Sequence, residues 1–142
     1  MKSLFYLILL AFFMSCSSNS IDNKNCKFLL DIGVNVAVNL NLPEYSQLQF
    51  TGNSVYIPNA GNGGVIVAFT GADYLAWDAA DPNHPQSECS VLVNSGLNAT
   101  CGCDDKNTYS LVTGAPLNNG SLQCSLRNYR VTTSGNTLLI SN

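Results

Sequence analysis

Charged side chains are scarce in this chain of 142 residues: they make up 11% of it, and only six of them are basic. Because no run or stripe of Lys and Arg occurs, the sequence excludes the electrostatic footprint of a nucleic-acid-binding surface. No long stretch repeats its apolar residues with a helical period, which speaks against a helical fold. Asn, Ser, Thr and Gly occupy the polar positions instead, a composition typical of short strands and turns. The length suits one domain.

Histidine is also nearly absent, with His84 as the single example. It stands between Pro82 and Pro85, in a stretch that predicts an exposed loop. A serine or cysteine nucleophile depends on a base that a third group orients, and one isolated imidazole is a weak basis for that chemistry. The sequence therefore predicts that the protein is not an enzyme of this kind.

No apolar run approaches the roughly 20 residues that a membrane-spanning helix needs. Lys2 is instead followed by a shorter apolar run at 4–14, the pattern of an export signal. Ser15, Cys16 and the polar run 17–20 then resemble a bacterial lipoprotein signal, in which the cysteine is lipidated and becomes the mature N-terminus. An ordinary secretory signal with a chance cysteine is the alternative, and the order of these features favours the lipoprotein.

The signal divides the chain into three parts: a signal peptide at 1–15, the lipidated Cys16 with a polar tether at 16–29, and a β domain at 30–142. Removal of Lys2 leaves five basic against nine acidic residues, a net charge of −4. An acidic domain gains nothing electrostatically from an anionic membrane surface, so the lipid is expected to provide the anchor. We expect a location on the cell membrane, facing the periplasm or the cell surface. Ser17, where an Asp would favour the inner membrane, favours the outer membrane.

Alternation of apolar and polar residues is clearest at 34–42, which predicts a half-buried strand. Other short apolar segments are separated by clusters of Gly, Asn, Ser and Asp, which predict turns. These segments predict further strands at 48–50, 55–57, 65–69, 74–78, 90–93, 97–101, 109–112, 126–132 and 137–140. The predicted fold class is all-β.

Two loops, at 81–89 and 101–105, are each preceded by a predicted hairpin, and the segments around them match a known pattern. The matching segments are Val65-Ile-Val-Ala-Phe69, Tyr74-Leu-Ala-Trp-Asp78, Cys101-Gly-Cys103, Tyr109-Ser-Leu-Val-Thr-Gly114, Ala115-Pro116, Leu126-Arg-Asn-Tyr-Arg-Val131 and Asn136-Thr-Leu138. In this order and spacing, residues 64–142 resemble the Rieske [2Fe-2S] iron-sulfur domain. The resemblance implies an antiparallel sheet sandwich that carries two cluster-type loops on a small subdomain.

In the Rieske family, the first loop carries a Cys-x-His pair with a further cysteine, and the second carries Cys-x-Cys-His. The first Cys and the His of each loop bind the two irons, and the remaining cysteines form a disulfide between the loops. By this resemblance, Cys89 and Cys103 are the disulfide pair. Four residues fall on ligand positions: Asp81, Asn83, Cys101 and Asp104.

A Rieske site needs two histidines, because imidazoles replace two thiolates on one iron. With His84 alone, the chain cannot build that site. We therefore expect a Rieske-like domain that has lost its cluster, binds no cofactor and serves as a binding or structural module with an unknown envelope protein as partner. The alternative is a [2Fe-2S] electron-transfer protein with unusual ligation. A four-thiolate cluster is possible by count alone, from among Cys26, Cys89, Cys101, Cys103 and Cys124, although thiols tend to pair in an oxidising compartment.

A Cys89–Cys103 disulfide would close a loop of about 15 residues and stabilise the fold by about 3 kcal/mol in the chain-entropy model. Cys101 is the odd member of the CxC pair, since neighbours at this spacing bridge each other only under strain. We expect it to pair with Cys124, in the segment that folds over the cluster in Rieske domains. That pairing leaves Cys26 unpaired or intermolecular.

Acidic and imidazole side chains in the two loops offer a different interpretation. Asp81, His84, Asp104 and Asp105 could converge as ligands for a divalent cation, which would allow an enzyme with an acidic pocket. Asp and Asn also form hydrogen bonds with neighbouring backbone groups in turns. The interpretation of these residues as turn residues is favoured. No metal site is therefore expected.

Overall fold

The computed structural model describes residues 26–142. The predicted signal peptide, Cys16 and the first part of the tether lie outside these residues. Within the described part, no helix is long and apolar enough to cross a membrane.

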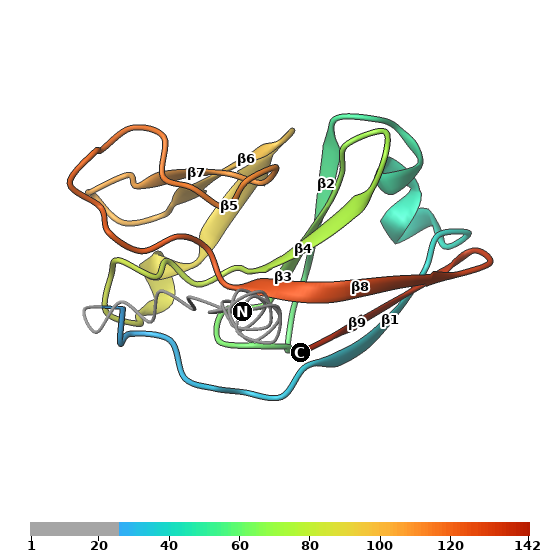
Figure 1. The fold of residues 1–142 in the computed structure, drawn as a ribbon, viewed down its shortest axis with the longest axis horizontal. Helices are drawn as coiled ribbons and strands as arrows, with labels where there is room; N and C mark the ends of the chain where they lie inside the picture. The colour runs from blue at the N-terminus through green and yellow to red at the C-terminus, as the bar shows by residue number, and fades with distance from the viewer. Residues whose placement is uncertain (1–25) are drawn as a thin grey trace, which may run out of the picture.

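A six-stranded antiparallel sheet forms the body of the domain, in the order β1-β9-β8-β4-β3-β2 (Figure 1). It bends between β4 and β8, which pair only through Ala76–Tyr129 and Trp77–Asn128. The two halves thus face different directions in Figure 1. The six strands are β1 (Asn35–Asn39), β2 (Asn53–Ile57), β3 (Val65–Phe69), β4 (Tyr74–Asp78), β8 (Asn128–Ser134) and β9 (Thr137–Ser141).

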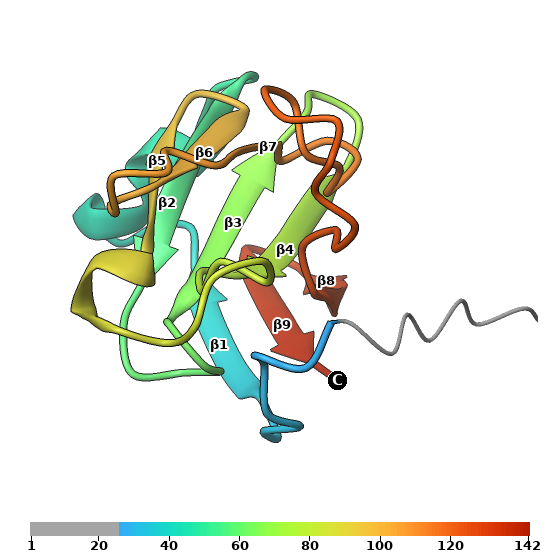
Figure 2. The same ribbon diagram turned by 90° about the vertical axis from the view of Figure 1, so that its left-hand side faces the viewer.

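A smaller three-stranded sheet, in the order β5-β6-β7, lies in front of β2 and the upper end of β3 in Figure 2. Its strands are β5 (Leu92–Ser95), β6 (Asn98–Cys101) and β7 (Thr108–Ser110). The chain enters this sheet after β4 and leaves it before β8, so the small sheet is an insertion between two paired strands of the large one. All pairings are antiparallel, which confirms the predicted all-β class.

Strand β3, which lies between β2 and β4, is buried on both faces, which explains its continuous apolar sequence. Val65 and Val67 belong to a core with β1, β8 and β9, whereas Ile66 and Ala68 belong to a second core under the small sheet. The second core also contains Trp77, whose indole N–H donates to the carbonyl of Leu111 at 2.8 Å. The two-loop region is therefore built on the face of the large sheet that carries this second core.

The predicted strand at 48–50 is wrong, because Pro43–Gln49 forms a 3-10 helix, η2. Pro43 at its start has the backbone angle of a first helical turn, and Glu44 lies in that turn. Leu48 is fully buried in the core, and the half-buried Tyr45 one turn before it packs against the same core. The strand predicted at 90–93 is shifted by two residues: Glu88–Ser90 forms the 3-10 helix η3, and β5 runs from Leu92 to Ser95.

The turn between β5 and β6 also differs from its prediction at Asn94–Gly96. Asn94 and Ser95 continue β5, with Ser95 opposite Asn98, so the turn consists of Gly96 and Leu97. Gly96 has φ = 57°, a conformation that glycine adopts without strain. The remaining strand ends lie within two residues of the predicted ones, apart from the end of the first strand, which was predicted at residue 42 and lies at Asn39 in β1.

Candidate functional site

The two predicted loops lie side by side at one end of the small sheet. The first follows β4, and the second connects β6 with β7. Cys89 and Cys103 form a disulfide between them, with Cα atoms 4.8 Å apart, the pairing that the family resemblance implies. Gly102 is required by this approach, because a Cβ there would lie 2.6 Å from the carbonyl oxygen of Cys89.

Asp81, the first of the four ligand-type positions, is fully buried and points into the protein. Its carboxylate accepts hydrogen bonds from the Tyr109 hydroxyl at 2.5 Å, from Asn107 Nδ2 at 2.9 Å and from the backbone N–H of Asn83 at 2.8 Å. Tyr109 is itself fully buried on β7. Asp81 therefore ties the first loop to the small sheet, through both of its oxygens.

Asn83, the second position, joins the first loop to a third segment. Its amide nitrogen donates to the Tyr109 hydroxyl at 2.8 Å and to the carbonyl of Cys124 at 2.7 Å. Its amide oxygen accepts from the backbone N–H of Cys124 at 3.1 Å. The side chain thus pairs with the backbone of Cys124 as a neighbouring strand would.

Cys101, the third position, is the single free cysteine of the described residues, and its side chain is buried. Burial raises the pKa of its thiol to about 12; a backbone hydrogen bond from Cys103 opposes this rise, while Asp81 and Asp105 add to it. Its sulfur lies 3.8 Å from the carbonyl oxygen of Cys89. A buried thiol with so high a pKa is chemically inert near neutral pH.

The predicted bridge between Cys101 and Cys124 is not formed. Cys124 pairs with Cys26 instead, with Cα atoms 5.6 Å apart. Cys101 faces the core between the loops, whereas the backbone of Cys124 is held by Asn83 on the other side of that loop. The prediction that Cys26 is unpaired or intermolecular is therefore wrong as well.

Residues 26–29, assigned to the tether, are thus joined to the domain. Besides the disulfide, the carbonyl of Phe28 accepts a hydrogen bond from Gln86 Nε2 at 2.7 Å. The next residue but one, Leu30, is bonded through its carbonyl to Arg127 Nη1 at 2.7 Å. These contacts bond the described end of the predicted tether to the β domain.

The predicted group of Asp81, His84, Asp104 and Asp105 does not converge as a whole. Asp104 is exposed, and the ring nitrogen of the half-buried His84 lies against the carbonyl of Pro85 at 2.7 Å. Among the described residues, the group with metal-ligand spacing is Asp81, Cys101 and Asp105, whose donor atoms lie within 4.8 Å of one another. The amide of Asn107 donates to both carboxylates, at 2.9 and 3.0 Å, and so occupies the place of a cation.

These residues do not fit a Rieske cluster. Two imidazoles are needed, and the chain has one. A four-thiolate cluster does not fit either, since four of the five described cysteines form disulfides and leave Cys101 alone. The polar atoms of Asp81 and Asn83 are used in hydrogen bonds within the protein.

Sequence reasoning missed Tyr109 and Asn107, the residues on which the site depends, because both were taken as ordinary loop and strand positions. It also missed Asp78, a second fully buried carboxylate at the end of β4. Asp78 accepts from the Tyr129 hydroxyl at 2.6 Å and from backbone N–H groups of Asn62, Gly63 and Ala80. An Asp three residues before another Asp, directly after a buried strand, is the signal that could have pointed to both.

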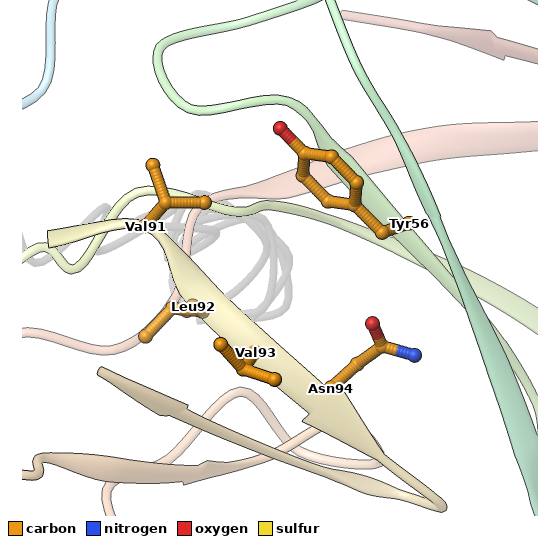
Figure 3. A pocket seen from close by; sticks show the side chains of 5 residues that line it. All are labelled: Tyr56, Val91, Leu92, Val93 and Asn94. Carbon is orange, nitrogen blue, oxygen red and sulfur yellow. The ribbon is translucent and has the colours of Figure 1, made fainter. Parts of the chain in front are cut away.

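A hollow of about 270 Å³ lies between β2 and the segment Val91–Asn94 that follows the first loop (Figure 3). Tyr56 forms one wall and residues Val91, Leu92, Val93 and Asn94 the other. Its lining is mainly apolar and contains no ionisable group besides the Tyr56 hydroxyl, which donates to the carbonyl of Gly63. The hollow therefore contributes no acid, base or metal ligand.

No model of a protein family matches the chain, and no curated protein is similar to it in sequence. Solved structures similar to it include the ferredoxin of carbazole 1,9a-dioxygenase from Nocardioides aromaticivorans IC177. That match has 20% identity and a TM-score of 0.48, and covers 77% of this chain and 96% of that one. A putative NADH-dependent nitrite reductase small subunit from Mycobacterium tuberculosis matches with 18% identity and a TM-score of 0.45, over 79% of this chain and 97% of that one.

The buried hydroxyls and thiol predict loss of stability at alkaline pH. Burial, and then hydrogen bonding to Asp81 or Asp78, raises the pKa of Tyr109 and Tyr129 above 10.0, while burial raises that of Cys101 from 9.0. Above these ordinary values the unfolded chain releases protons that the folded chain keeps, so stability is present below about pH 9 and falls as the pH rises. The loss is at most about 1.4 kcal/mol per group and pH unit.

Urea unfolding between about pH 8 and 12 measures this effect, with Tyr109→Phe as the comparison. The free energy of unfolding of Tyr109→Phe should fall less steeply with pH than that of the wild type, because the variant lacks one of the three titrating groups. An unfolding midpoint that stays constant to about pH 11 would contradict the prediction.

Proposed function

We propose that this chain is a lipid-anchored protein of the cell envelope, whose Rieske-like domain has lost its iron-sulfur cluster and acts as a binding or structural module rather than an enzyme. The proposal rests on the hydrogen bonds that Asp81 and Asn83 form within the protein. These side chains stand at two ligand-type positions, and both are hydrogen-bonded inward to Tyr109 and to the segment at Cys124. The position of the cluster has become part of the protein interior.

Two disulfides and this hydrogen-bonded network hold together the two loops and the segments that adjoin them. Cys89–Cys103 links the two loops, and Cys26–Cys124 links the N-terminal segment to the connection before β8. In the described residues, no buried side-chain nitrogen or oxygen lacks a hydrogen-bond partner. A region so fully satisfied is stable without metal, which leaves its surface as the means of acting on a partner.

Iron content tests the loss of the cluster. The full chain, purified after expression with iron supplied, should be colourless, with iron near zero by elemental analysis and with the circular dichroism of a folded β protein. The Cys101→Ser variant is the matched control, since Cys101 is the one free thiol of the described residues. About two irons per chain, a brown colour and a paramagnetic signal after reduction, all lost in Cys101→Ser, would establish the electron-transfer alternative.

Export and lipidation have support of their own. Two disulfides in a chain of this size are typical of an oxidising compartment outside the cytoplasm. Labelled fatty acid should enter the wild-type protein and not a Cys16→Ala variant, and membrane fractionation should place the protein in the outer membrane. Label that remains in Cys16→Ala would refute the anchor, whatever the iron content.

A further inference from the structure

The sulfurs of the Cys89–Cys103 disulfide are in contact with two polar side chains of the first loop. The Ser87 hydroxyl lies 3.3 Å from Cys89 Sγ and 3.8 Å from Cys103 Sγ. The Nδ1 atom of His84 lies 3.9 Å from Cys103 Sγ. A purely structural disulfide between two loops needs neither group, yet the single histidine of the chain lies next to this one.

The hydrogen on the imidazole can be assigned from its other contact. Nδ1 of His84 lies 2.7 Å from the carbonyl oxygen of Pro85, and a carbonyl only accepts, so Nδ1 carries a hydrogen. The same Nδ1 lies 3.9 Å from Cys103 Sγ, within reach of a thiolate formed there, and the Ser87 hydroxyl can donate to either sulfur. Both side chains thus present donors, which stabilise a thiolate if the disulfide opens.

The two sulfurs differ in exposure. Cys89 is exposed on η3, whereas only 7% of Cys103 is accessible. An incoming thiolate therefore reaches Cys89, and Cys103 is the leaving group. The imidazole N–H lies beside Cys103, the sulfur that receives the negative charge. The exposure of Cys89 and the stabilisation of a Cys103 thiolate therefore favour the same direction of attack.

We propose that Cys89–Cys103 is a redox-active disulfide that oxidises a dithiol of a partner polypeptide. A substrate thiolate attacks Cys89 Sγ, forms a mixed disulfide and expels Cys103 as a thiolate beside His84 and Ser87. The second substrate thiol, as its thiolate, then attacks the substrate sulfur of the mixed disulfide, forms the substrate disulfide and releases Cys89. Two electrons pass from the substrate dithiol to the protein disulfide, and the two protons of the substrate pass to solvent or to the two cysteines.

Cys101 stays outside this exchange although it is close to Cys89. It is buried, and its raised pKa keeps it a thiol at neutral pH, so it does not attack the disulfide and scramble the pairing. This activity is independent of whether the domain holds an iron-sulfur cluster. It is also independent of how the protein is anchored.

The charges next to the disulfide select the substrate. Glu88 and Asp104 adjoin the two cysteines in sequence, Asp105 follows, and all three are exposed. The nearest cation, Lys106, donates its Nζ to the carbonyl of Gly102 at 3.0 Å. These carboxylates oppose a thiolate at long range but are screened by salt, whereas the N–H contact is direct. They favour a neutral or basic dithiol over an acidic one.

Exchange rates within one molecule test the proposal, because Cys26–Cys124 is an internal control with 5% of Cys124 accessible. The full chain is mixed with a lysine-containing peptide that has two cysteines, then quenched, alkylated and mapped by mass spectrometry. We expect Cys89–Cys103 to be reduced at least about tenfold faster than Cys26–Cys124. His84→Gln should slow the first rate about tenfold, and Ser87→Ala about threefold, with no change in the second.

An equilibrium measurement separates stabilisation of the thiolate from mere access. In a glutathione redox buffer, His84→Gln should shift the Cys89–Cys103 equilibrium about tenfold toward the disulfide. Equal reduction rates for the two disulfides, or an unchanged rate and equilibrium in His84→Gln, would overturn the proposal. A reaction with glutathione, which is anionic, as fast as with the basic peptide would overturn the preference for basic substrates.

Discussion

Replacing Asp81 with alanine should lower the free energy of unfolding by about 4 kcal/mol, a large effect for one substitution. The buried Tyr109 hydroxyl would lose its acceptor, and so would one N–H of Asn107 and the backbone N–H of Asn83. Each buried donor left without an acceptor costs about 1 to 3 kcal/mol. Urea unfolding followed by circular dichroism at pH 7 measures the difference.

Asp104→Ala is the matched control, since it removes a carboxylate from the same pair of loops at an exposed position. It should change stability by no more than about 0.5 kcal/mol. Tyr109→Phe removes the hydroxyl but keeps the ring, and in combination with Asp81→Ala should cost less than the sum of the two single changes. A loss below about 1 kcal/mol in Asp81→Ala would show that the network does not hold the loops together.

Strands with a strong local pattern could be predicted from the sequence almost to the residue. The apolar run Val65–Phe69 and the next strand, Tyr74–Asp78, are found where they were expected, as β3 and β4. Burial on both faces produces such a run, and a tight turn with Gly71 at φ = 97° joins the two strands. The sequence of a segment is enough to predict its structure where the segment's own apolar pattern determines that structure.

Segments whose structure depends on one contact were misjudged. Residues 48–50 alternate like a strand, but only Leu48 is buried, and Pro43 begins a 3-10 helix before it. The site shows the same limit. Asp81 looks like a turn residue until β7 brings Tyr109 to it from 28 positions away, and no short-range pattern encodes that meeting.

The disulfides show a third limit. The family resemblance was sufficient for Cys89 and Cys103, because their loops are part of the shared pattern. It was not sufficient for Cys124, since the partner Cys26 lies 98 positions away, outside the matching segments. This chain has therefore added a link at a point where the resemblance carries no information, and that link has the larger predicted effect on stability.

Removal of this link by Cys26→Ser with Cys124→Ser is expected to lower the free energy of unfolding by about 4.7 kcal/mol, because cross-linking about 100 residues strongly restricts the unfolded chain. The N-terminal segment should also become sensitive to protease, since it is then held only by noncovalent contacts, chiefly the hydrogen bonds of Phe28 with Gln86 and of Leu30 with Asn62 and Arg127. Urea unfolding and limited proteolysis measure the two effects.

The matched comparison is Cys89→Ser with Cys103→Ser, which opens a loop whose ends are 14 positions apart. Its expected cost is about 3 kcal/mol, smaller than that of the longer loop, because the entropy of closure grows with the logarithm of loop length. The two pairs are distinguished further by the protease, which should cut near residues 26–32 only when Cys26 and Cys124 are replaced. A larger loss of stability in the shorter loop would mean that packing around Cys89 and Cys103, rather than restriction of the unfolded chain, decides how these disulfides stabilise the fold.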